Sequence, residues 1–164
     1  MSEDDRWNYQ VRGETPNQRL DRNLVELLQE VRVAQVGVQA LLAFLLAVAF
    51  TPRFEVLTAL QRNAYVASLV LGAGSTALLI APAAFHRVVF RRRLKRELVH
   101  ACSRMAIVGL ILMMLSISTS MLLILDVVLG LRTALWLSGA ILGWFSLWWY
   151  ILPLRYRWIG RRKS

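Results

Sequence analysis

Four long stretches of the chain are almost entirely hydrophobic, and polar stretches separate them. The hydrophobic stretches cover approximately residues 33–50, 64–84, 105–129 and 133–152. Each is close to or above the roughly twenty residues that an α-helix needs to cross ~30 Å of hydrocarbon. None alternates as a barrel strand does, and the last has no polar face of the kind that a soluble helix bundle requires. The pattern therefore predicts an all-α, polytopic membrane protein with four transmembrane helices.

The polar segment before the first hydrophobic stretch predicts a helix that begins outside the membrane and continues into it. Thr15 is a candidate N-cap, Pro16 fits the first helical position, and Gln18 completes a capping box. Apolar residues then recur at helical spacing, and no helix-breaking residue interrupts the chain before residue 33. We expect one long helix whose N-terminal extension is amphipathic.

These elements divide the chain into three parts. Residues 1–13, which include three adjacent acids, are expected to be a disordered N-terminal tail. Residues 14–152 form the predicted four-helix transmembrane domain. Residues 153–164 form a basic tail on the same side of the membrane as the N-terminus.

The distribution of basic residues predicts the orientation of the four helices. Seventeen of the 20 Lys and Arg lie before residue 33, between the second and third hydrophobic stretches, or in the C-terminal tail. The other two connections carry only Arg53, Arg62 and Arg132. Because Lys and Arg are enriched in cytoplasmic loops, both termini are predicted to be cytoplasmic and the protein is assigned to the plasma (inner) membrane.

Composition and charge indicate what kind of partner the protein binds. The chain is 57% hydrophobic and 18% charged, yet its net charge is +10. The basic residues lie in blocks between membrane helices, so their nearest phosphates are anionic lipid headgroups, and no nucleic acid is expected. The simpler alternative is a positive anchor with no further role. The lipid-headgroup candidates are Arg87, Arg91, Arg92, Arg93, Lys95 and Arg96.

The N-terminal extension is acidic, and it predicts a further contact with this basic loop. Glu26 and Glu30 lie one helical turn apart, beside the connection that contains the loop. We expect one of them to pair with a basic residue between Arg91 and Arg96.

Several segments resemble a known family. They are "ETPNQRLDRNLVELLQEVRVAQVGVQALLAF", "QRNAY", "APAAFHR" and "LDVVLG", and together they cover roughly residues 14–130. The chain is similar to an uncharacterised family of small actinobacterial membrane proteins, which is a domain of unknown function whose members are occasionally labelled sodium/proton antiporters. The resemblance implies a fold and a location in the membrane, and it implies almost nothing about mechanism.

A few polar side chains fall within the hydrophobic stretches. Arg32, Gln35 and Gln39 share one face of the first helix, and Asp126 is the acid of the third hydrophobic stretch. Intramembrane polar groups are candidates for a proton or cation site. Asp126 also lies about a full membrane thickness from the inner end of its helix, so an interfacial acid that snorkels or pairs with Arg132 is the alternative.

Small residues at four-residue spacing predict close helix packing. Ser68, Gly72 and Thr76 form such a row on the second helix, and Gly139 and Gly143 form a G-x3-G pair on the fourth. Either row can serve internal packing or a contact between copies.

The sequence contains no recognisable catalytic, cofactor-binding or metal-binding motif. It has one cysteine and two histidines, which are too few for a Cys/His metal site. We therefore expect a non-enzymatic protein that acts by association with itself, with anionic lipid or with a larger membrane complex. The alternative is a small oligomeric cation or proton transporter that uses Asp126 and the Arg32/Gln35/Gln39 face.

Overall fold

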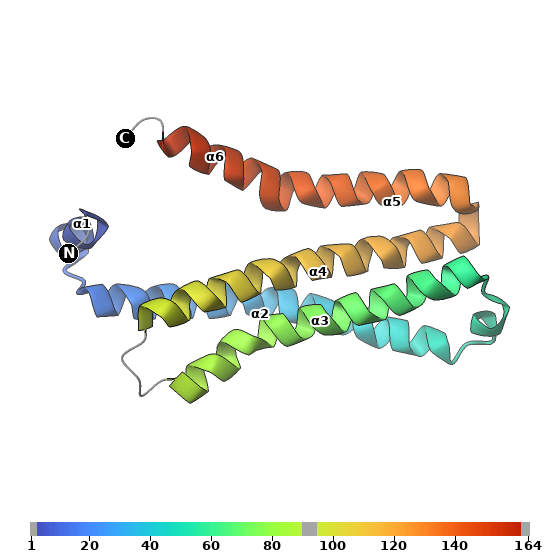
Figure 1. Cartoon of the computed structure of the whole chain (residues 1–164), viewed down its shortest axis with the longest axis horizontal. Coiled ribbons are helices and arrows are strands. Elements are labelled where there is room, and N and C mark those ends of the chain that lie inside the picture. The colour runs from blue at the N-terminus through green and yellow to red at the C-terminus, as the bar shows by residue number, and fades with distance from the viewer. Residues whose placement is uncertain (1–2, 90–94, 162–164) are drawn as a thin grey trace. The chain divides into compact units, whose positions relative to one another are not determined.

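The computed structural model describes residues 3–89 and 95–161, and the described residues are almost entirely helical. Figure 1 shows the order of the elements. They are α1 (Glu3–Arg12), α2 (Pro16–Ala49), the 3-10 helix η1 (Pro52–Val56), α3 (Ala59–Val89), α4 (Lys95–Leu129), α5 (Leu131–Ser146), the π-helix η2 (Leu147–Ile151) and α6 (Leu152–Arg161). The predicted all-α fold is confirmed.

Four helical segments are long and apolar enough to cross a membrane. They are Gln18–Ala49, Ala59–Phe85, Val99–Leu129 and Leu131–Tyr156. Mean hydropathy is highest in the third of them, at 2.4, and lowest in the fourth, at 1.4. The four spans predicted from the hydrophobic pattern are therefore present as helices, and the chain has the character of a polytopic membrane protein.

The predicted N-terminal extension is confirmed in detail. The backbone N–H of Thr15 donates to Gln18 Oε1 at 2.8 Å, and the N–H of Gln18 donates to Thr15 Oγ1 at 3.4 Å. This reciprocal capping box starts α2, which then runs without a break to Ala49. The extension and the first membrane span are one helix.

The N-terminal tail differs from the expectation of disorder. Residues Glu3–Arg12 form α1, which ends where the N–H of Gly13 donates to the carbonyl of Tyr9 at 3.0 Å. Gly13 has a φ of 66°, a left-handed conformation that glycine adopts without strain and that commonly closes a helix. Gly13 was the signal in the sequence for this helix end.

The C-terminal part also differs from the prediction. Instead of ending near residue 152, the fourth helix passes through the π-turn η2 into α6, so residues 153–161 of the basic tail are helical. Pro153 explains the interruption, because its ring would collide with the carbonyl of Trp149 in a regular α-helix. In η2 the N–H of Leu152 donates to the carbonyl of Leu147, five residues earlier, immediately before the proline.

The described residues form two compact units, and each long helix contributes to both. The first unit contains residues 1–40 and 74–111. Here the start of α2 packs on the start of α4, where Cys102 is fully buried against Leu24. Partly buried Leu27, Leu28 and Val99 complete this cluster.

The second unit contains residues 41–73 and 112–164. Its core cluster joins Leu45 of α2, Tyr65 of α3 and Leu123 of α4. The hydroxyl of buried Tyr65 donates to the Leu45 carbonyl at 3.0 Å, so this polar group is satisfied within the core. In the same unit α4 ends at Leu129, and Gly130, with a φ of 82°, makes the turn into α5.

Candidate functional site

The intramembrane acid Asp126 has a partner that the sequence analysis missed. Gln61, near the start of α3, donates from Nε2 to Asp126 Oδ2 at 3.0 Å, and both side chains are half-buried. Among the described residues, Asp126 forms no ion pair with Arg132, so the predicted arginine pairing is wrong. The neutral amide of Gln61 satisfies one carboxylate oxygen, and no described Lys or Arg lies within ion-pair distance of Asp126.

A sequence signal for Gln61 was present. Thr58 and Gln61 form a second capping box, in which the Thr58 N–H donates to Gln61 Oε1 at 3.1 Å and the Gln61 N–H donates to Thr58 Oγ1 at 3.3 Å. This motif marks the first turn of α3. Since Asp126 lies in the last turn of α4 in the same unit, the two side chains come from helix ends that a short-loop bundle brings together.

The three polar residues that share a face of α2 do not form one site. Gln35 is half-buried and donates from Nε2 to the carbonyl of Leu79 at 2.7 Å, whereas Arg32 and Gln39 are exposed. They belong to the first unit, and Asp126 belongs to the second.

The Gln35 contact lies one turn before a proline in the partner helix. Pro82 is fully buried inside α3, and it has no N–H to donate to the carbonyl of Leu78. The helix continues past it to Val89, so the proline does not end α3. One residue further along, the carbonyl of Leu79 accepts the Gln35 amide. The bond gives the Gln35 amide a partner in an apolar setting.

The small-residue row on α3 is used for internal packing in the second unit. Ser68 is fully buried and donates to Thr119 Oγ1 at 2.9 Å, while Ser116 donates to the Ser68 carbonyl at 2.8 Å. Gly72 is also buried, and a Cβ atom at this position would lie 2.9 Å from Leu42 Cδ2 and 3.1 Å from Ser116 Oγ. These small residues therefore allow α2, α3 and α4 to approach closely. Thr76, the last member of the row, lies in the first unit and is half-buried.

The glycine pair on α5 has the opposite environment. Gly139 and Gly143 are exposed, and no atom lies within 4 Å of a Cβ built at either position. The buried residues of α5 are Ala134 and Ser138, on roughly the opposite face of the helix. The hydroxyl of Ser138 is enclosed, and among the described residues it has no hydrogen-bond partner. Consequently α5 uses one face to pack within its unit and leaves its glycine face uncovered.

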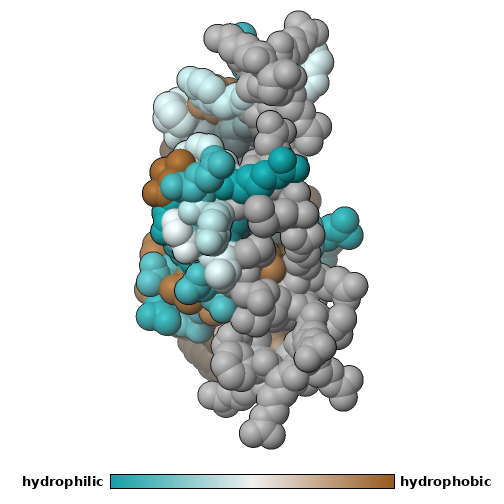
Figure 2. Space-filling view, turned by 90° about the vertical axis from the view of Figure 1, so that its left-hand side faces the viewer, coloured by the Kyte–Doolittle hydropathy of each residue, from teal (hydrophilic) through white to brown (hydrophobic). Residues whose placement is uncertain are grey.

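The predicted lipid-headgroup residues Arg87, Arg91, Arg92, Arg93, Lys95 and Arg96 lie outside the residues whose side chains the structure describes. The predicted pairing of Glu26 or Glu30 with this loop therefore remains a prediction. Glu26 already accepts a bond from Arg22 Nη1 at 3.0 Å, and Arg22 Nε donates to Glu14 at 3.1 Å. Figure 2, which faces the end where α2 begins, shows largely hydrophilic described residues with hydrophobic ones among them.

The described part of α6 presents both aromatic and basic side chains. Arg155, Tyr156 and Trp158 are exposed, with 75% of Tyr156 accessible. Earlier in the same run Trp144 and Trp148 pack with ring centroids 5.8 Å apart, and Phe145 and Trp149 with centroids 5.0 Å apart. Aromatic rings beside basic residues are typical of a helix end at a membrane–water interface.

Comparison with known proteins places the chain in a family without assigning it an activity. The model of a family of unknown function (DUF6328) matches residues 13–153. No curated protein and no solved structure matches the chain. The predicted resemblance to an uncharacterised family is confirmed over most of the chain.

Proposed function

We propose a function for this chain from the premise that it belongs to DUF6328, a family of unknown function: it is a non-enzymatic multi-pass protein of the plasma membrane that acts by association. Its first partner is a second copy of itself, or the helix of a larger membrane complex, seated on the glycine face of α5. Its second partner is anionic lipid, bound by the basic segments on the side of the termini.

One observation carries this proposal, namely the uncovered face of α5. Only 6% of the most apolar window in the fourth span is buried within the chain, compared with 39% in the third. Gly139 and Gly143 lie on that open face, and no described atom lies within 4 Å of a Cβ built on either. At Gly72, by contrast, Leu42 and Ser116 occupy the space where a Cβ would lie. A G-x3-G pair lets two helix backbones approach closely, and such packing drives helix association in lipid. The two glycines therefore support a helix–helix contact made outside the chain.

The lipid part of the proposal rests on charge and on α6. Exposed Arg155 and Tyr156 lie at the very end of the fourth span, where a basic residue gains about 1 kcal/mol from an anionic surface. The basic loop between α3 and α4 adds to this attraction in the proposed topology, in which both termini are cytoplasmic.

The proposal is tested by measuring self-association of the full chain in lipid. Donor- and acceptor-labelled protein, reconstituted into phosphatidylcholine vesicles at varied protein-to-lipid ratios, should show energy transfer that saturates as a specific dimer or small oligomer. Gly139→Leu and Gly143→Leu should raise the apparent dissociation constant about fivefold or more, because misfitted packing costs ~1–3 kcal/mol.

Leu137→Phe is the matched control, since it adds bulk to an exposed position of α5 away from the glycines. It should leave the dissociation constant unchanged. Equal energy transfer in the wild type, both glycine variants and the control would overturn association through this face.

The alternative function is a small oligomeric cation or proton transporter. The observation in its favour is the half-buried carboxylate of Asp126, which is bonded to an amide and has no ion pair with any described basic residue. Exposure of Arg32 and Gln39 removes two of the polar groups that it would use inside the chain. Ion flux into vesicles distinguishes the two functions, as described in the Discussion.

A further inference from the structure

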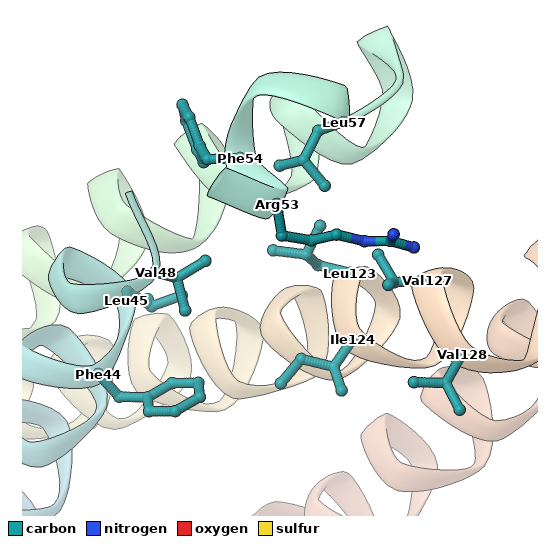
Figure 3. Close-up of a pocket in the computed structure, with 10 residues that line it drawn as sticks. All are labelled: Phe44, Leu45, Val48, Arg53, Phe54, Leu57, Leu123, Ile124, Val127 and Val128. Atoms are coloured by element: carbon teal, nitrogen blue, oxygen red, sulfur yellow. The ribbon is translucent and has the colours of Figure 1, made fainter. Parts of the chain in front are cut away.

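An apolar pocket with a single charged residue opens in the second unit, at the end where α2 passes into η1. Its volume is about 150 Å³. The lining residues come from the last turns of α2, from η1 and the residue after it, and from the last turns of α4; they are Phe44, Leu45, Val48, Arg53, Phe54, Leu57, Leu123, Ile124, Val127 and Val128. Figure 3 shows Arg53 extending from η1 along the pocket, with its guanidinium on the side of Val127.

The wall of the pocket is held in place by contacts within the unit. Phe54 packs edge-on against Tyr65, with ring centroids 4.9 Å apart, and the Tyr65 hydroxyl is bonded to the Leu45 carbonyl. Thr51 Oγ1 donates to the Val48 carbonyl at 2.7 Å where α2 ends. The pocket is therefore formed by fixed side chains and does not require a ligand to assemble it.

The position of the pocket relative to the membrane spans indicates which part of the bilayer surrounds it. The first and third spans end at Ala49 and Leu129, so the pocket is lined by their last turns. Arg53 lies just beyond the first of these ends, at the level where lipid headgroups replace hydrocarbon. Phe44 and Val128 are 55% and 69% exposed, so the mouth opens on the surface that faces the bilayer.

Size and charge identify the class of ligand. A dry apolar cavity of about 150 Å³ holds a benzene-sized molecule, so this pocket has room for on the order of six carbon atoms. That is a segment of one acyl chain. Among the described residues, Arg53 makes no ion pair with Asp or Glu within 4 Å, and an arginine guanidinium can bind a phosphate with two parallel hydrogen bonds.

From this arrangement we infer that the pocket is a binding site for a single anionic phospholipid of the leaflet on the Arg53 side. One acyl chain enters between α2 and α4, and the phosphate lies against Arg53. The lining residues include neither glycine of α5, and the site does not depend on the proposed self-association.

Photo-crosslinking of the full chain tests the site. The probes are phosphatidylglycerol and phosphatidylcholine that each carry a diazirine on one acyl chain, added in small amounts to phosphatidylcholine nanodiscs that contain the protein. Peptide mass spectrometry should find the phosphatidylglycerol label on residues of α2 and α4 that line the pocket. Labelling by phosphatidylcholine should be weaker by about fivefold, the factor that corresponds to the ~1 kcal/mol attraction of one basic residue for an anionic surface.

Two variants separate the contributions of the charge and the cavity. Arg53→Gln should reduce phosphatidylglycerol labelling to the phosphatidylcholine level, and Ile124→Trp should reduce labelling of the pocket by both lipids because the indole fills it. Arg62→Gln and Val66→Trp are matched controls at exposed positions of α3 that do not line the pocket, and they should label like the wild type.

Arg53 is exposed, so its replacement leaves the fold intact even if the tryptophan variant does not elute as a single species. Equal labelling by the two lipids in the wild type, or labelling unchanged by Arg53→Gln, would overturn the inference. Pocket labelling by a diazirine fatty acid without labelling by phosphatidylglycerol would equally overturn it, because the ligand would then be a free fatty acid.

Discussion

Gln61 uses both ends of its side-chain amide, and Asp126 is the partner at one of them. The oxygen of the amide accepts the Thr58 N–H and starts α3, while the nitrogen donates to Asp126 Oδ2 at 3.0 Å at the end of α4. Gln61 thus caps α3 and also makes the only side-chain hydrogen bond to the Asp126 carboxylate among the described residues. Loss of Gln61 should affect both.

A double-mutant cycle measures the Gln61–Asp126 bond without the capping contribution. Gln61→Ala, Asp126→Ala and the double variant should yield a coupling free energy of about 0.6 kcal/mol, the average for interhelical hydrogen bonds in a membrane protein, for which the maximum is about 1.7 kcal/mol. The measurement is unfolding of the purified protein by titration with a denaturing detergent, followed by circular dichroism. Asn63→Ala, at an exposed position of α3, is the control and should not couple to Asp126. A coupling near zero would show that the contact contributes nothing to stability.

Ion flux distinguishes association from transport. For a protein that acts by association, vesicles with wild-type protein should show no more proton, sodium or potassium flux than protein-free vesicles. Asp126→Asn keeps a polar side chain of the same shape but removes the charge, so it should change nothing in this assay. Wild-type flux above the empty-vesicle level that Asp126→Asn abolishes would contradict the proposal and establish the transporter.

The backbone of this fold could be predicted from the sequence because its signals are local. Hydrophobic length identified the four spans, and the Thr15–Gln18 capping box located the start of α2. The polar contacts could not be predicted in the same way, because helical spacing shows which residues share a face but not which neighbour lies opposite. Arg32, Gln35 and Gln39 share a face by spacing, yet among the described residues Gln35 alone of the three has a hydrogen-bond partner, the Leu79 carbonyl of another helix.

The glycines illustrate the same limit. The spacing of Ser68, Gly72 and Thr76 and that of Gly139 and Gly143 gave equivalent predictions of close packing. The structure distinguishes the two rows. A Cβ built on Gly72 would meet Leu42 and Ser116, whereas one built on Gly139 or Gly143 would meet no described atom within 4 Å. The difference depends on long-range arrangement, which a repeat of small residues does not encode.

Gly109 is expected to tolerate no side chain. A Cβ atom there would lie 2.9 Å from both Cγ and Cδ2 of Leu79, which is itself fully buried in the first unit. Gly109→Ala should therefore lower the free energy of unfolding by about 1–3 kcal/mol, the usual cost of overpacking a core. Gly139→Ala is the matched control, because its Cβ meets nothing, and in detergent that keeps the chain monomeric it should be neutral or stabilise by up to about 1 kcal/mol. Equal stability of the two variants would contradict the close packing of α3 on α4 at Leu79.

The orientation in the membrane can be tested with single cysteines in intact cells. Cys102 is fully buried, and replacing it by alanine gives a background without reactive thiols. On that background, Arg53→Cys and Arg132→Cys should react with a membrane-impermeant maleimide from outside, because positive charge is retained on the cytoplasmic side and these two positions belong to the connections poor in Lys and Arg. Arg93→Cys and Lys163→Cys should react only after the cells are permeabilised. The reverse pattern would place the termini outside the cell, and it would move the basic segments away from the leaflet whose anionic lipids they are proposed to bind.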